Sequence, residues 1–296
     1  MGDPAHISAA KVPTRLGPLH VQTAGSGPPA VLWHSLFVDS TTWVRVAQPL
    51  AATRRLVLID GPAHGDNPPV PHRFTLDDCV GAAADVLDHF GIDEPVDWLG
   101  NAWGGHVGIL FAAAHPGRCR TLTAIGAPVH ALTAAERRQT VLLSSLYRIT
   151  GPVRPLVNAL VDALLGPCAR ADDAEGAALV ADAFRRADRR GMYAAIRWLS
   201  LGRRDLTPVL DTIGAPTLLT TGAHDPMWTT TNAHAAAAHL PQGGLVILPG
   251  AGHIGPLLQA PSNVAELVTG FWREPAAQVA HHRDAPAPPA ARPLTT

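Results

Sequence analysis

The 296-residue sequence predicts an α/β fold with a mostly parallel central sheet flanked by helices. Two observations lead to this class. Six short runs rich in apolar and β-branched residues are closed by Gly or Pro, which is typical of buried strands. Stretches with helical periodicity lie between several of these runs. Apolar strands that alternate with helices indicate a parallel sheet covered on both faces.

The alternation of predicted strands and helices is found in the N-terminal and C-terminal parts of the chain and is interrupted between them. The helical periodicity is clearest at 75–91 and 104–117. The pattern breaks between Val129 and Asp211, where no strand is predicted. The predicted strands are PAVLWHS (29–35), RRLVLIDG (54–61), PVDWLG (95–100), CRTLTAIGAP (119–128), PTLLTTG (216–222) and GLVILPG (244–250).

The interrupting segment, 129–211, is predicted to form a helical cap. It contains several helical stretches, the first of which begins with a capping box at Thr133 and Glu136. Helices inserted in a parallel sheet usually lie over the C-terminal edge of the strands, where ligands bind. The alternative is that these helices cover one face of the sheet.

The remaining chain divides into a core and a tail. Segments 1–128 and 212–273 are predicted to form the core together. Residues 274–296 are rich in Pro and Ala without periodicity, so we expect a disordered C-terminal tail.

Composition narrows the classes of partner. A formal net charge of -1, from 23 basic and 24 acidic residues, gives no reason to expect nucleic acid or an anionic membrane as partner. No run approaches 18 apolar residues, so no membrane span is predicted, and the N-terminus lacks the pattern of a secretory signal. The scattered Cys79, Cys119 and Cys168 predict neither a zinc site nor a disulfide framework. We therefore expect a cytoplasmic protein.

The stretch GNAWGG (100–105) predicts a sharp turn from a strand into a helix. Gly100, Ala102, Gly104 and Gly105 fit the pattern G-x-Nu-x-G-G, where Nu is a catalytic nucleophile and the glycines allow close backbone approach. The nucleophile position is strained for any residue with a Cβ, at a cost of about 1–3 kcal/mol. A simple turn would favour Gly there. Ala102 retains the strain but has no hydroxyl group.

Two further residues complete the pattern of a catalytic triad. Asp225 follows the strand at 216–222, and His253 follows the last predicted strand. The chain order of nucleophile, acid and His is that of one class of serine hydrolase. A single His among 15 is usually structural, but this position favours a general base. Asp225 is then the acid that orients His253.

An oxyanion hole is predicted from two backbone N–H groups. One comes from the loop after the strand at 29–35, where Leu36 is the expected donor and Phe37 its neighbour. The other comes from Trp103, directly after the nucleophile position. Because both donors are main-chain groups, their side chains are not constrained.

These motifs resemble the α/β-hydrolase fold over roughly residues 14–273. The loop HSLFVDSTTW is similar to that of enol-lactonases and related hydrolases of small esters and carbon–carbon bonds. Two departures stand out, because Ser35 replaces the usual glycine and Ala102 replaces the nucleophile. In this fold the cap follows strand 6, here the strand at 119–128. The matching motifs are WHSLFVDS, DGPAHGDNP, GNAWGG and GAGHIGP.

The missing nucleophile has three explanations. The chain is a serine hydrolase with its nucleophile substituted, or a natural homologue that uses His253 and Asp225 for acid–base lyase or isomerase chemistry, or a ligand-binding protein on an inherited fold. The intact Asp and His disfavour the third. Trp103 after the nucleophile position resembles the Asp-Trp pair of haloalkane dehalogenases and epoxide hydrolases, and Tyr147 and Tyr193 fall in the cap, where epoxide hydrolases use Tyr. The H-G-W-P loop of epoxide hydrolases and the Asn or Glu that dehalogenases often have at position 36 are absent, so Ser is favoured over Asp at 102.

The resemblance implies an ester or lactone hydrolase without metal or organic cofactor. A hydroxyl at 102 would attack the carbonyl, His253 would transfer the proton, and Asp225 would orient the imidazole. The expected partner is a largely apolar small molecule with a carbonyl, and the protein is expected to be a monomer or homodimer. The predicted substrate contacts are Phe37, Tyr147, Met192, Tyr193, Trp198, Trp228 and Ile254.

Overall fold

The computed structural model describes residues 7–248 and 252–283. Within these ranges, eight strands form one sheet in the order β1-β2-β4-β3-β5-β6-β7-β8. β2 pairs antiparallel with both β1 and β4, and every other pairing is parallel. The predicted mostly parallel sheet is therefore confirmed. The strands are β1 (Ser8–Thr14), β2 (Gly17–Ala24), β3 (Pro29–Trp33), β4 (Arg55–Ile59), β5 (Val96–Asn101), β6 (Cys119–Ile125), β7 (Thr217–Gly222) and β8 (Gly243–Leu248).

The six predicted strands correspond to β3 through β8. β3 and β6 end two and three residues before the predicted ends, at Trp33 and Ile125, because the residues that follow form loops at the C-terminal edge of the sheet. Residues 249 and 250 of the last predicted strand lie outside the described residues. The antiparallel hairpin of β1 and β2 was not predicted. Its outer strand, β1, is mostly solvent-exposed and contains only one fully buried residue, Val12.

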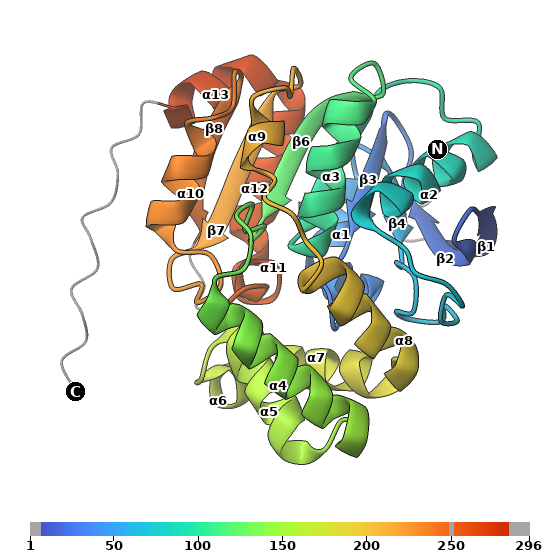
Figure 1. Cartoon of the computed structure of the whole chain (residues 1–296). Coiled ribbons are helices and arrows are strands. Elements are labelled where there is room, and N and C mark those ends of the chain that lie inside the picture. The colour runs from blue at the N-terminus through green and yellow to red at the C-terminus, as the bar shows by residue number, and fades with distance from the viewer. Residues whose placement is uncertain (1–6, 249–251, 284–296) are drawn as a thin grey trace.

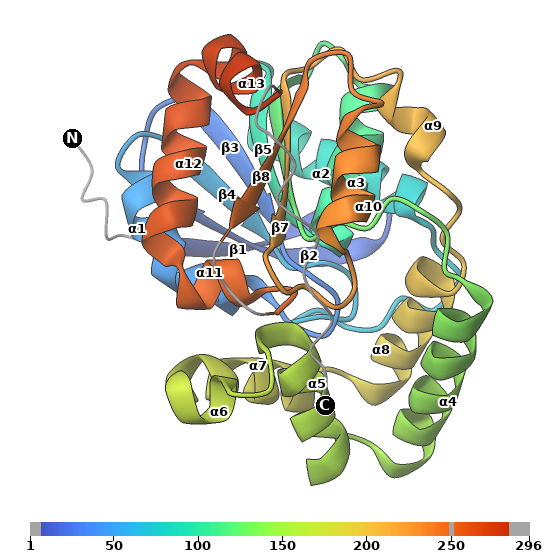
Figure 2. The same ribbon diagram turned by 90° about the vertical axis from the view of Figure 1, so that its left-hand side faces the viewer.

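Helices cover both faces of the sheet, as the two views in Figures 1 and 2 show. One face carries α1 (Val44–Ala51), α11 (Gly255–Gln259) and α12 (Pro261–Arg273), packed over Leu32 and Leu99. The 3-10 turn η1 (Ser40–Trp43) leads into α1. The opposite face carries α2 (Leu76–His89), α3 (Trp103–Ala114), α9 (Thr207–Leu210) and α10 (Thr230–Ala237). None of the described helices is both long and apolar enough to cross a membrane.

The helices that follow β6 form a separate layer below the C-terminal ends of the strands in Figure 1. The first of them, α4, begins with the predicted capping box, in which Thr133 Oγ1 accepts from the Glu136 N–H at 3.3 Å. We refer to this layer, residues 134–200, as the cap. Its elements are α4 (Ala134–Thr150), α5 (Arg154–Leu165), α6 (Ala169–Asp172), α7 (Ala174–Arg186), α8 (Arg189–Ala195) and the π-helical turn η2 (Ile196–Ser200).

Two predicted boundaries need correction. The chain returns to the core before residue 211, because Leu206 N–H donates to Val129 O at 2.8 Å and α9 packs against α3. Part of the predicted disordered tail is also helical, since α13 (Pro275–Arg283) packs on β8 and buries Val279. A single buried side chain gives too weak a periodicity to predict this helix. Residues 284–296 lie outside the described residues.

Candidate active site

Ala102 occupies a strained turn between β5 and α3. Its backbone has φ 47° and ψ -102°, a conformation that residues with a Cβ rarely adopt. Two hydrogen bonds hold the turn, because Ala102 N–H donates to Ile125 O at 2.8 Å and His106 N–H donates to Ala102 O at 2.9 Å. The sharp strand-to-helix turn expected from the sequence is thus present, with the methyl group of Ala102 at its apex, and we call residues 100–105 the elbow.

The glycines of the elbow are required by close contacts. A Cβ on Gly104 would lie 1.8 Å from Trp33 O, and a Cβ on Gly100 would lie 2.2 Å from the carbonyl carbon of Gly104. Both contacts involve main-chain atoms of the core, which cannot move aside. The elbow geometry is therefore fixed by backbone packing and does not depend on a hydroxyl at residue 102.

Asp225 and His253 come together beside this turn from the loops after β7 and β8. His253 Nδ1 lies 2.8 Å from Asp225 Oδ2, and both side chains are buried. The other oxygen, Oδ1, accepts from the N–H groups of Met227 at 2.8 Å and Trp228 at 3.2 Å. Burial opposes the charge, but the positive potential and hydrogen bond of His253 and the two N–H donors hold the pKa of Asp225 below its ordinary value.

Gly126 supports this pair and was not singled out from the sequence. It has φ +55°, and a Cβ there would lie 2.8 Å from His253 O and 3.3 Å from both Asp225 Oδ2 and His253 Nδ1. A glycine directly after a strand at the site edge was the available signal. Only the fold reveals that the Asp and His lie against it.

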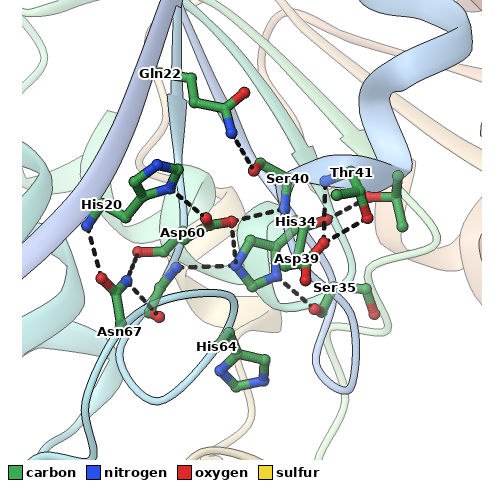
Figure 3. A network of polar contacts seen from close by, with 12 residues as sticks. His20, Gln22, His34, Ser35, Asp39, Ser40, Thr41, Asp60, His64 and Asn67 are labelled. Atoms are coloured by element: carbon green, nitrogen blue, oxygen red, sulfur yellow. Dashed lines mark hydrogen bonds and ion pairs between the residues drawn. The ribbon is translucent and has the colours of Figure 1, made fainter. Parts of the chain in front are cut away.

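The loop after β3 is held by buried histidines, shown in Figure 3. His64 Nδ1 donates to Pro62 O at 2.8 Å, which leaves Nε2 to accept from the Phe37 N–H at 3.3 Å. Burial, with a smaller effect from His34, lowers the pKa of His64 to about 3, so its ring is neutral. Phe37 has φ 75°, and its N–H is fixed to His64 rather than free for a ligand.

Asp60 connects this loop to the motif DGPAHGDNP. Its Oδ1 accepts from the Ser40 N–H at 2.6 Å, and its Oδ2 lies 2.8 Å from His20 Nδ1 (Figure 3). Asn67 closes the motif by donating to Asp60 O at 2.6 Å and Gly61 O at 3.1 Å. The motif therefore supports the loop that contains Leu36 and holds it in place.

The two N–H groups predicted to form the oxyanion hole have no protein acceptor among the described residues. Trp103 is the first residue of α3, so its N–H lies in the turn that has no intrahelical partner. Leu36 and Trp103 both line the same cavity as Ala102 and His253. This arrangement can receive a carbonyl oxygen beside a histidine base.

The cavity has a volume of about 410 Å³ and lies between the elbow and the cap. Its walls are mainly apolar, which suits an apolar ligand with few polar anchors. Tyr147 stacks on Phe184 at 4.9 Å between ring centroids, and burial raises the pKa of Tyr147 to about 12. The cap contributes Leu156, Leu160, Leu164, Phe184, Ile196 and Leu199.

Of the seven predicted substrate contacts, Phe37 and Tyr147 line the cavity. The structure places the other five elsewhere. Met192, Trp228 and Ile254 are fully buried in the hydrophobic core. Trp198 packs edge-on to Phe74, and Tyr193 lies 5.0 Å from the Arg148 guanidinium.

One end of the cavity is polar, which the sequence did not predict. This end lies where the loop after β6 meets the start of α4 and the segment that follows η2. We call it the polar end. It is formed by His106, His130, Glu136, Ser200 and Arg203.

Comparison with known proteins agrees with this architecture. Residues 28–260 match the family described as alpha/beta hydrolase fold. The chain belongs to this family. The α/β-hydrolase is 30% identical to a pimeloyl-[acyl-carrier protein] methyl ester esterase of Neisseria meningitidis over 226 residues, which cover 75% of this chain and 84% of that protein.

Two other comparisons cover different amounts of the chain. A pimeloyl-[acyl-carrier protein] methyl ester esterase of Chromobacterium violaceum is 35% identical over 108 residues, 36% of this chain but only 40% of the relative's length. The crystal structure of the enol-lactonase from Burkholderia xenovorans aligns with a TM-score of 0.81 and 21% identity over 90% of this chain and 100% of that one. At that identity the second likeness concerns the fold.

Proposed function

We propose that this α/β-hydrolase has the site of an ester or lactone hydrolase of the Ser-His-Asp type, in which residue 102 is the nucleophile position. The observation that carries the proposal is the retained strain of Ala102 next to the hydrogen-bonded Asp225–His253 pair. With Ala102 in place, the chain binds a carbonyl substrate but cannot form an acyl-enzyme.

The geometry supports a role for each group. With a hydroxyl at residue 102, His253 would take its proton during attack on the carbonyl carbon and deliver that proton to the leaving oxygen. Asp225 would hold Nδ1 of His253 in the required tautomer. The N–H groups of Leu36 and Trp103 would stabilise the negative charge that develops on the carbonyl oxygen.

The reaction class also has support from the relatives. Two relatives are named as methyl ester esterases. Both names describe cleavage of an ester bond. Phe37 and Tyr147 are proposed to contact the apolar part of the substrate, because both line the cavity.

The test is to restore the hydroxyl. Ala102→Ser is expected to hydrolyse a short activated ester such as 4-nitrophenyl acetate, and Ala102→Ser with His253→Ala is expected to lose at least about 100-fold of that rate. The native chain is the matched control. An Ala102→Ser protein that folds normally but is inert on a panel of esters and lactones would contradict the proposal.

A second candidate function uses the chain as it stands. The Asp225–His253 pair is intact and borders an open cavity, so it can act as a general base on a bound water or on a carbon acid. In that case the native chain turns over substrate, and His253→Ala abolishes turnover. If the native chain binds esters but never converts them, this second function is excluded and the first is favoured.

A further inference from the structure

Arg203 is a partly buried cation at the polar end of the cavity. It follows the π-helical turn η2, in which Leu201 N–H donates to Ile196 O at 2.9 Å. The extra residue of a π-turn shifts the following segment relative to an α-helix, and such turns are frequent at functional sites. Here the segment after the turn brings Arg203 to the cavity wall.

The guanidinium of Arg203 is incompletely paired. Nη2 donates to His130 O at 2.9 Å, whereas Nε is buried and has no hydrogen-bond partner in the described chain. Nη1 lies 3.4 Å from His106 Nε2. That nitrogen lies 2.9 Å from Pro128 O and must donate to it, so it cannot accept from Arg203.

Glu136 and Asp205 attract this cation from a distance and so offset part of the cost of its burial. Within the described residues, Arg203 makes no ion pair with a carboxylate. Glu136 accepts hydrogen bonds from Thr133 in the capping box, and Asp205 accepts from the Thr207 N–H at 2.9 Å. Burial lowers the pKa of Arg203 to about 10, which still leaves the group charged at neutral pH.

The buried, unpaired Nε and the lack of a contacting carboxylate among the described residues favour a ligand that supplies one. We propose that Arg203 forms an anion subsite in the cavity and that the substrate carries a carboxylate in addition to the carbonyl that is attacked. Arginine suits this role because its planar guanidinium matches the geometry of a carboxylate. The proposal deepens the proposed function, on which it rests for the placement of the carbonyl.

The position of Arg203 also limits the length of the substrate. Arg203 contacts His106, which lies four residues after Ala102 on α3. Four residues of α-helix advance about 6 Å. A carboxylate bound at Arg203 would therefore be separated by only a few carbon atoms from a carbonyl bound at Leu36 and Trp103. The substrate class is a short dicarboxylic acid esterified at one end, or a lactone with a pendant carboxylate.

The experiment uses the native chain, in which Ala102 prevents formation of an acyl-enzyme. Calorimetry compares monomethyl glutarate, which has one carboxylate, with dimethyl glutarate, its neutral counterpart. We expect the monoester to bind at least about tenfold more tightly, as a charge-assisted hydrogen bond would give. Arg203→Met should remove this preference and leave the affinity for the diester within about twofold.

Three variants make the result specific. Arg204→Met is the matched control, because Arg204 is exposed and pairs with Asp77 at 3.5 Å on the surface, so the preference should persist. Glu136→Gln should strengthen monoester binding. Glu136 lines the same end of the cavity, and its negative charge repels the carboxylate of the monoester. Arg203→Lys retains the charge and should keep part of the preference, which guards against misfolding of the Met variant.

Two results would overturn the anion subsite. One is a native chain that binds the monoester no better than the diester or not at all. The other is a preference that survives in Arg203→Met. The proposed function is tested separately by ester hydrolysis in Ala102→Ser. If the native chain prefers the monoester but Ala102→Ser does not hydrolyse esters, the anion subsite is supported and the hydrolase function is rejected. If Ala102→Ser hydrolyses esters but the native chain shows no preference for the monoester, the hydrolase function is supported and the anion subsite is rejected.

Discussion

The elbow and the outer face of α4 are built in opposite ways. At the elbow every residue from Gly100 to Gly105 is buried, and main-chain contacts leave no room for a side chain on Gly104. On α4 several large apolar side chains face solvent, with Leu142 69% and Ile149 77% exposed. The structure of the elbow is therefore determined by main-chain packing, whereas the outer face of α4 is formed by exposed side chains of the cap.

This difference indicates a division of roles. The core fixes the Ala102 turn, the Asp225–His253 pair and the two free N–H groups, which together define the chemistry that is available. The cap supplies most of the cavity wall. The segment just after the cap supplies the Arg203 cation. We therefore expect substitutions in the core to affect the reaction or the fold, and substitutions in the cap to affect substrate choice.

The largest effect is expected at Asp225. In the Ala102→Ser background, Asp225→Asn should lower kcat by about 10⁴-fold, because the amide cannot hold His253 in the productive tautomer. The measurement is steady-state hydrolysis of 4-nitrophenyl acetate. Asp211→Asn is the control, since Asp211 lies 3.1 Å from His239 in an exposed Asp–His pair of the same composition. A loss of less than tenfold at Asp225 would break the assignment of the catalytic acid.

The next effect is on stability at the elbow. Gly104→Ala should lower the free energy of unfolding by at least about 3 kcal/mol, because its Cβ would overlap the Trp33 carbonyl oxygen. Gly117→Ala, where a Cβ meets no atom within 4 Å, should change it by less than about 0.5 kcal/mol. Urea denaturation measures both. Equal stability of the two variants would show that the turn tolerates a side chain.

A smaller, pH-dependent effect is expected where the cap meets the core. Asp39 accepts from Arg186 of α7 at 2.7 Å. Burial opposes the charge of Asp39, but the Thr41 hydroxyl, the potential of His34 and the Arg186 guanidinium hold its pKa below the ordinary 3.8. Because the folded-state pKa is the lower one, this stabilisation is present at neutral pH and is lost as the pH falls through that pKa.

The variant that tests this contact is Asp39→Asn. It should reduce the free energy of unfolding at pH 7 by about 1 kcal/mol, a value that allows for solvent screening of the half-exposed Arg186. The difference from the native chain should shrink as the pH falls below 3.8 and disappear below the lower folded-state pKa, where the native carboxyl becomes protonated. Asp182→Asn removes the exposed pair with Arg185 and should show neither change. A difference at pH 7 that persists in acid would contradict the ionic contribution.

The smallest effect is expected on the outer face of α4. Leu142→Gln should change the free energy of unfolding by less than about 0.5 kcal/mol, since the side chain is 69% exposed and loses little packing. Thermal unfolding followed by circular dichroism gives the comparison. A loss above about 1 kcal/mol would show that this face is packed against something in solution.

Much of the core could be predicted from the sequence because its signals are local. Continuous apolar runs identified β3 to β8, and the glycines around Ala102 identified a turn whose φ of 47° the structure shows. Asp225 and His253 were recognised by their places after strands, and the structure brings them within 2.8 Å. The edge hairpin of β1 and β2 was not predicted, because half-exposed strands lack a continuous apolar run.

The cavity wall could not be predicted because it depends on which face each cap helix turns inward. The sequence predicts Met192 and Trp228 as substrate contacts, yet both are core residues with 0% exposure. Leucines on α5 and Arg203 line the cavity instead. A charged residue in a loop is normally solvated, so only the three-dimensional arrangement shows that Arg203 is partly buried and lines the cavity.

Covalent labelling of residue 102 tests the central claim most directly. The native chain and Ala102→Ser are each incubated with a serine-directed fluorophosphonate and analysed by intact-protein and peptide mass spectrometry. We predict one adduct on Ala102→Ser, located at residue 102 and suppressed by His253→Ala, and no adduct on the native chain. A folded Ala102→Ser protein that stays unlabelled at residue 102 would contradict the claim that this site is a serine hydrolase centre lacking only its nucleophile.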